Sequence, residues 1–164
     1  MPKFVADSAE TTGLKWAAPA GGGKVLQVVQ GTLTSSFTTT STSFSDTGLT
    51  VSITPSSATS KVLVLVSGMV TATRSGSGTN APAEWKLLVS STQLQRMTLG
   101  MYDIASSTSP ELNGALNFGH LHSPSTTSST TYKVQGRAMA GSITATLLGA
   151  ADAIASIIAM EIGA

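Results

Sequence analysis

Two histidines stand one residue apart, at His120 and His122, and they are the clearest candidates for metal ligation in the chain. In an extended strand, positions i and i+2 share a face and lie about 7 Å apart. Two such imidazoles bind a transition metal when other ligands converge, and a threefold axis would bring six nitrogens together. No carboxylate neighbours the pair in the sequence to orient the rings. We therefore expect both side chains to face solvent or to hydrogen-bond to nearby hydroxyls.

The rest of the sequence contains no recognisable catalytic motif. The chain has no cysteine, which excludes disulfides, thiolate metal sites and thiol nucleophiles. The segment GGGK at 21–24 resembles the end of a phosphate loop, but Val25 stands where Ser or Thr would bind magnesium. There is no G-x-S-x-G elbow, and the 8 carboxylates are scattered along the chain. We predict a non-enzymatic protein without a cofactor.

The charge distribution gives no sign of a nucleic-acid or membrane partner. The formal net charge is +1, and neither sign is clustered. Charged residues make up 10% of the chain, whereas an ordinary soluble domain has about 25%. No run reaches the roughly 18 apolar residues needed to span a bilayer, and the first residues lack the apolar segment of a secretory signal. A weakly charged chain of positive mean hydropathy is typical of a protein that buries part of its surface in an assembly.

The stretch 42–73 carries the strongest structural pattern. Valines and leucines alternate over 61–67, so a strand there would be apolar on both faces and would belong in the middle of a packed sheet. Over 49–54, apolar residues alternate with hydroxyl residues, which predicts a strand with one face on a core. Pro55 ends that strand, because proline cannot donate to the ladder.

Similar patterns separated by turn residues recur along the chain. The predicted strands are 25–34, 37–44, 49–54, 61–73, 84–90, 93–99, 116–122, 131–139, 143–148 and 154–162. The last one also fits a helix, but we favour a strand, because 142–148 and the connection after it look like a hairpin. The prediction is an all-β fold, a two-sheet antiparallel β-sandwich of jelly-roll type with an extended N-terminal arm.

The first 23 residues differ from those that follow. They end in three glycines, a flexible hinge by composition. Two apolar pairs, separated by ADSAETTG, predict a small hairpin-like arm: Phe4, Val5, Leu14 and Trp16. So short an arm cannot bury these side chains alone, so it either returns to its own domain, stays partly disordered or anchors the protein to a partner. We predict an attachment arm and glycine hinge at 1–23 and a sandwich domain at 24–164.

Three connections are candidate recognition tips, because loops on a rigid sandwich commonly carry binding. They are the loops at 74–82, 102–114 and 123–130. A sugar-binding module is one alternative, in which Trp85 or Tyr102 would stack on a sugar ring.

Several segments resemble parts of tailed-bacteriophage virion proteins, which include the head domains of tail fibres and small capsid decoration or cement proteins. They are FVADSAETTGLKWAAPAGGG, KVLQVVQ, SFSDTGLTVSITPSSATSKVLVLVSG and SIIAMEIGA. The resemblance implies a homotrimeric sandwich on a phage particle, made in the host cytoplasm. It also implies attachment to the major capsid protein or another virion protein through the amino-terminal segment.

Within that resemblance, the length of the chain favours a decoration or cement protein. Tail fibres generally need a long shaft, whereas only about 23 residues precede the first sandwich strand here, without heptads or collagen-like repeats. The alternative is a tail-fibre or tail-tip head domain whose loops bind the host surface, with surface glycans as candidate ligands.

Overall fold

The computed structural model describes residues 3–6, 14–17, 23–76, 82–100, 111–149 and 153–163. Every regular element among them is a strand, and no described helix is long and apolar enough to cross a membrane. The strands are β1 (Lys3–Ala6), β2 (Leu14–Ala17), β3 (Val25–Leu33), β4 (Phe37–Thr39), β5 (Ser45–Ile53), β6 (Lys61–Arg74), β7 (Ala83–Val89), β8 (Thr92–Leu99), β9 (Glu111–His122), β10 (Thr130–Ala138), β11 (Ile143–Leu147) and β12 (Ala155–Ile162).

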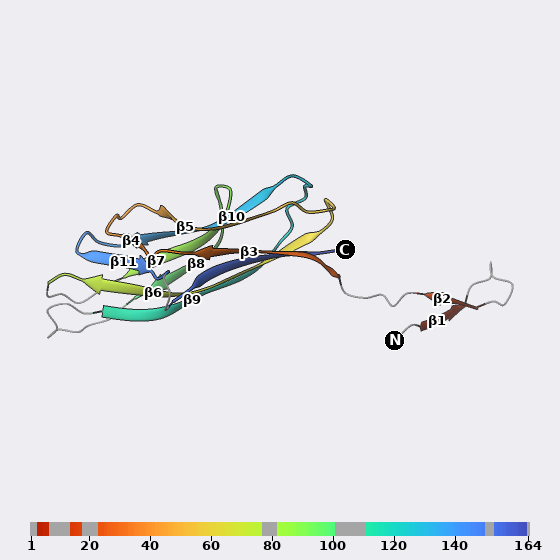
Figure 1. The fold of residues 1–164 in the computed structure, drawn as a ribbon, viewed down its shortest axis with the longest axis horizontal. Coiled ribbons are helices and arrows are strands. Elements are labelled where there is room, and N and C mark those ends of the chain that lie inside the picture. The colour runs from red at the N-terminus through yellow and green to blue at the C-terminus, as the bar shows by residue number, and fades with distance from the viewer. Residues whose placement is uncertain are drawn as a thin grey trace.

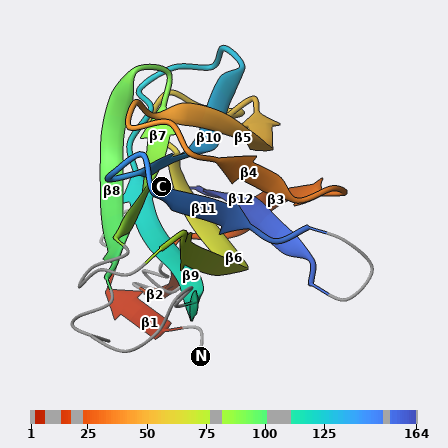
Figure 2. The same ribbon diagram turned by 90° about the vertical axis from the view of Figure 1, so that its left-hand side faces the viewer.

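Two antiparallel sheets pack face to face as a sandwich of jelly-roll type, which confirms the predicted fold class (Figures 1 and 2). The smaller sheet has the order β5-β10-β7-β8. The larger has the order β3-β12-β6-β11-β4, and β9 pairs with the other edge of β6. The core lies between them and includes the fully buried side chains of Trp85, Tyr132 and Leu49.

Strand β6 is the centre of the larger sheet, but it buries only one face. Val62, Val64 and Val66 point into the core, as the alternation predicts. Leu63 and Leu65 lie on the opposite face, where Leu65 is 38% exposed. The strand is therefore central in its sheet and apolar on both faces, as predicted, but its outer face is not covered, because a two-layer sandwich covers only the inner face of each sheet.

The C-terminal segment is a strand, as favoured, but the predicted hairpin between β11 and β12 is wrong. Both strands are antiparallel to β6 and lie end to end along one edge of it. Leu147 pairs with Val70, and Ser156 pairs with Ser67. With 14 residues, β6 is long enough to pair with both shorter strands.

The predicted strand at 37–44 is also wrong in its second half. β4 ends at Thr39, and β5 begins at Ser45 in the other sheet, four residues before the predicted start. Between them, the Ser41 amide donates to Thr39 Oγ1, and Ser41 Oγ accepts from the Ser43 amide. These local hydroxyl bonds replace ladder bonds and let the chain cross from one sheet to the other.

A buried carboxylate joins three segments at the edge of the larger sheet. Glu161 on β12 is fully buried and accepts hydrogen bonds from Gln27 Nε2 at 2.7 Å and from the amide and hydroxyl of Ser56 at 2.8 and 2.7 Å. The bonds from Gln27 and then Ser56 lower the pKa of Glu161 to about 2. Glu161 thus holds β3 and the turn after Pro55 against β12.

Candidate functional site

The N-terminal residues form the predicted hairpin. β1 and β2 pair in an antiparallel two-stranded sheet of their own, which pairs with no strand of the sandwich among the described residues (Figure 1). The register places Phe4 opposite Trp16 and Ala6 opposite Leu14, while Val5 stands opposite Lys15. Three of the four predicted attachment residues thus occupy two cross-strand pairs, which are separated by the pair that contains the fourth. The predicted bends at 7–8 and 12–13 and the glycines at 21–22 lie outside the described residues.

The outer face of the larger sheet carries large apolar side chains across four strands. The register aligns Val28 on β3, Met160 on β12, Leu63 on β6 and Leu121 on β9 in one row. The next row contains Ile158 and Leu65. We call this set the apolar face: Val28, Leu63, Leu65, Met69, Leu121, Ile158 and Met160. Within it, Val28 is 58% exposed, Leu121 50% and Met69 41%.

A shallow hollow of about 420 Å³ interrupts the apolar face beside Gly119. Leu65 and Ile158 line it on one side and Asn117 on the other. It exists because Gly119, which pairs with Leu65, has no side chain to fill the row. The face therefore combines exposed apolar side chains with a recess.

The outer face of the smaller sheet has the opposite character. Glu84, almost fully buried, accepts a hydrogen bond from Arg137 Nε at 2.7 Å. The Phe44 ring lies under two cations, with Lys86 Nζ 4.0 Å and the Arg137 guanidinium carbon 4.7 Å from its centroid. Arg96 adds a longer contact to Glu84 at 3.6 Å. The two outer faces thus differ in chemistry, one charged and one apolar.

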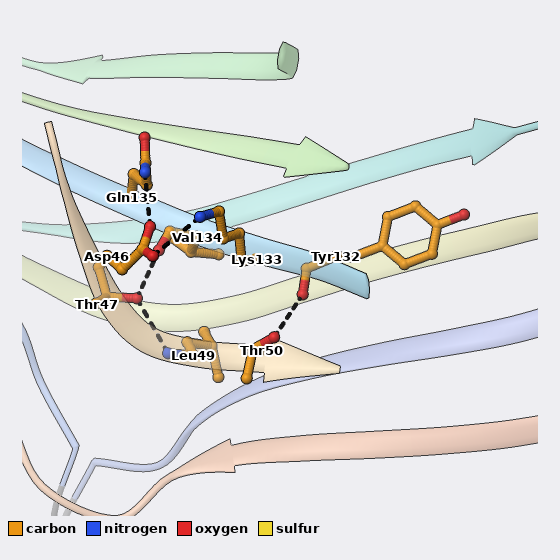
Figure 3. A network of polar contacts seen from close by, with 8 residues as sticks. All are labelled: Asp46, Thr47, Leu49, Thr50, Tyr132, Lys133, Val134 and Gln135. Carbon is orange, nitrogen blue, oxygen red and sulfur yellow. Dashed lines mark hydrogen bonds and ion pairs between the residues drawn. The ribbon is translucent and has the colours of Figure 1, made fainter. Parts of the chain in front are cut away.

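Figure 3 shows the polar contacts between β5 and β10 near an irregularity in their pairing. The β5–β10 register shifts between Lys133 and Gln135, next to Gly48 with its φ of 87°. Thr47 Oγ1 donates to the Val134 carbonyl at 2.9 Å, which satisfies an acceptor that the shifted ladder would leave unpaired.

Asp46 lies beside this irregularity and accepts from Gln135 Nε2 at 2.6 Å and from Lys133 Nζ at 2.9 Å (Figure 3). The hydrogen bond from Gln135 and then the ammonium of Lys133 lower the pKa of Asp46. Both partners stabilise the charged carboxylate. The arrangement is a closed set of intramolecular contacts, and it orders the face of the sheet.

Of the two histidines, His122 contacts a hydroxyl group, as expected. Their register opposite Val64 and Val62 places His120 and His122 on the inner side of β9, at one end of the sandwich. His122 Nδ1 lies 2.8 Å from the Tyr132 hydroxyl. Burial, and then the nearby His120, lower the pKa of His122. In the described part of the chain, no group of three His, Asp or Glu side chains is placed to hold a metal ion.

The proposed sugar-stacking role of Trp85 is wrong. Its side chain is fully buried between the sheets, in an edge-to-face contact with Phe37 at 6.4 Å between ring centroids. A sugar ring cannot reach it. Tyr102 lies outside the described residues.

The candidate recognition loops do not all lie at the same end of the sandwich. Loop 123–130 follows His122, which pairs with Val62 near the end of the sandwich where β3 begins. Arg74 and Glu111, which flank the other two connections, lie at the opposite end of β6. Residues 77–81 and 101–110 are outside the described chain, and 111–114, predicted as loop, belong to β9.

The sequence contained a signal for the apolar face. Leu63 and Leu65 alternate with the core valines, and Leu121 separates the two histidines. A strand that is apolar on both faces, in a fold with only two layers, must expose one of them. Combining these two inferences would have identified the surface.

No known sequence family and no curated protein matches this chain. Weak structural similarities exist. Dimeric latent PorU from Porphyromonas gingivalis has a TM-score of 0.44 and 9% identity, over 88% of this chain and 14% of that one. The infectious bursal disease virus VP2 subviral particle has a TM-score of 0.32 and 11% identity, over 98% and 44% of the chains. This chain therefore spans less than half of either protein, and likenesses at this level carry no argument about function.

Proposed function

We propose that this protein is a non-enzymatic structural protein of a tailed-bacteriophage virion, a homotrimeric capsid decoration or cement protein attached through its N-terminal hairpin. The observation that carries the proposal is the hairpin itself, which pairs with no described strand of the sandwich. The resemblance of the N-terminal segment to virion proteins supports the same assignment. The major capsid protein or another virion protein is the partner.

The hairpin has the properties of an anchor. An isolated two-stranded hairpin is at best marginally stable in water, so β1 and β2 need a further surface to pack against. Phe4 and Trp16 form a cross-strand pair, and Leu14 stands two pairs further along the register, opposite Ala6. Aromatic side chains carry a large share of binding energy in protein interfaces. Phe4, Val5, Leu14 and Trp16 would contact the capsid, with Phe4 and Trp16 contributing most.

Immunogold labelling of intact virions tests the location. We expect gold particles on the head, with a density that reflects many copies per capsid. Label confined to the tail would support the alternative, a tail-fibre or tail-tip head domain that contacts the host from the end of the sandwich near Arg74 and Glu111. Virions with no label, although the antibody recognises the purified protein, would overturn the virion assignment.

A further inference from the structure

We propose that the apolar face is the surface through which copies of this chain associate, with three faces enclosing a common apolar centre. The inference rests on the proposed function in one respect, because it adopts the homotrimer and assigns its contact surface. The evidence is the chemistry, the extent and the width of the face.

The chemistry of the face suits burial. The charged residues that the structure describes on this side of the sheet lie at its two ends. Lys61 is at one end of β6, and Glu111 stands opposite Thr73 at the other. Between them the outward positions of β3, β12, β6 and β9 hold only apolar, hydroxyl and amide side chains and one glycine. Burying this region would leave no charged side chain without a partner, while Lys61 and Glu111 would stay solvated at the rim.

Two hydroxyls in the middle of the face are already paired with each other. Ser67 Oγ lies 3.1 Å from Ser156 Oγ, on adjacent strands in the middle of the sheet. Such a pair loses little on burial, because one hydroxyl satisfies the other. Large side chains such as Leu121 and Val28, which are half exposed or more, would lose contact with water.

The extent of the face matches a specific protein interface. Strands β3, β12, β6 and β9 lie side by side over Lys61–Ser67, and β6 and β9 continue together to Thr73. At about 4.8 Å per strand and 3.3 Å per residue, this area is roughly 630 Å². A standard interface takes about 800 Å² from each partner. A stable contact therefore needs most of this face, and other copies of the chain present the same apolar surface to it.

The width of the face favours a threefold arrangement. Packed sheets lie about 10 Å apart, so each face lies about 5 Å from the middle of the apolar layer that it shares. Three faces at about 5 Å from one axis form a triangle with sides of about 17 Å, close to the span of four strands at about 4.8 Å spacing. The apolar row Val28–Met160–Leu63–Leu121 crosses four strands. Three copies would thus bury it, and the hollow beside Gly119 would receive a side chain of a neighbouring copy.

Sedimentation velocity of the purified full-length protein, with paired variants, tests this inference. We expect the wild type to sediment at three times the chain mass of 16.6 kDa. The double variant Leu65→Glu/Leu121→Glu places charges on exposed positions of the apolar face, so it should fold normally but dissociate to monomers. Its apparent dissociation constant should rise by at least about 100-fold, because a charge buried without a partner is costly.

The matched control is Ser52→Glu/Gln93→Glu, which adds two charges to exposed positions on the outer face of the smaller sheet. It should remain trimeric. Circular dichroism and the melting temperature establish that both variants are folded. A trimeric Leu65→Glu/Leu121→Glu protein, or a wild type that is monomeric at millimolar concentration, would overturn the inference.

Two other outcomes are informative. A wild-type dimer that the apolar-face variant dissociates would contradict the threefold arrangement. A wild-type monomer whose apolar face gains protection from hydrogen exchange only on virion particles would assign the face to the capsid partner instead, and would overturn self-association. Neither result changes where gold label lies on the virion, so failure of this inference and failure of the proposed function remain distinguishable.

Discussion

Glu161 is the residue on which the closure of the sandwich edge depends most directly. Its carboxylate is fully buried and is held by donors from β3 and from the turn after Pro55. A buried acceptor of this kind stabilises the fold only while it carries its charge. Two predictions follow from its chemistry, one for substitution and one for pH.

Replacing Glu161 by Gln leaves a buried amide group facing the donors of Gln27 and Ser56. Unpaired buried donors are costly, and we expect the melting temperature to fall by about 5 °C or more. Differential scanning calorimetry at pH 7 measures the change. Glu111→Gln, at an exposed position on β9, is the matched control and should have almost no effect. Equal melting temperatures for the two variants would contradict the role of Glu161.

Acid should destabilise the fold in a window set by Glu161. Its pKa is about 2 in the folded protein against an ordinary value of 4.5. The stabilisation is therefore complete above pH 4.5 and is lost as the pH falls from about 4.5 to about 2, because the unfolded chain takes up the proton first. Urea unfolding at a series of pH values should show this loss in the wild type, and the slope should be smaller in Glu161→Gln. Parallel pH profiles would contradict the assignment.

His122 adds a separate pH effect at higher pH. Burial lowers its pKa below the ordinary value of 6.5, so its contribution is complete above pH 6.5 and is lost as the pH falls through the folded-state pKa. NMR titration of the ring protons should give a pKa below 6.5 for His122. A pKa of 6.5 or above would contradict the burial of the ring against Tyr132.

Gly136 tests the packing of the core. A side-chain carbon there would overlap with the indole ring of Trp85, which is fully buried and cannot move away. We expect Gly136→Ala to lower the free energy of unfolding by about 2–3 kcal/mol, as for other overpacked cores. Gly141→Ala, where no atom lies within 4 Å of the added carbon, is the control. Urea denaturation of both variants measures the difference.

At the scale of elements, the sequence determined the strands well because alternation is a local property. In β10, which was predicted as a strand over 131–139, Tyr132, Val134 and Gly136 point inward and alternate with polar residues. The order of strands in each sheet depends on pairings between distant residues, so alternation could not reveal it. The tandem placement of β11 and β12 on β6 is the clearest case.

Other differences arose where side chains bond to the backbone. The prediction of a strand over 37–44 was wrong in its second half because the hydroxyls of Thr39 and Ser41 accept hydrogen bonds from backbone amides. The start of β5 was missed because residues 45–48 contain no large apolar side chain, so the inward position there is taken by the buried Thr47. Of the candidate site, the hairpin was predictable from its two apolar pairs. The cross-strand placement of Phe4 and Trp16 required the register.

The hairpin and the sandwich should be independent elements. Because β1 and β2 pair with no described strand of the sandwich, deletion of residues 2–20 should leave the melting temperature within about 2 °C of the wild-type value and the oligomeric state unchanged. Calorimetry and sedimentation velocity measure the two properties. A markedly lower melting temperature would mean that the hairpin packs on its own sandwich, as the competing interpretation of the arm holds.

At the scale of the whole molecule, the protein has three surfaces of different chemistry. The charged face of the smaller sheet is internally paired through Asp46 and Glu84. The apolar face of the larger sheet is open and is assigned to self-association, and the hairpin is assigned to attachment. Under these two proposals, assembly and attachment use separate parts of the chain, so we expect that each can be removed without the other.

The most direct test of this account is binding to virion particles that lack the protein. Full-length protein, the deletion of residues 2–20 and the double variant Phe4→Ser/Trp16→Ser would each be mixed with such particles, and the bound fraction measured after sedimentation. We predict that the full-length protein binds and that both altered proteins, although folded, stay in the supernatant. Binding of the altered proteins at the wild-type level would contradict attachment through the hairpin.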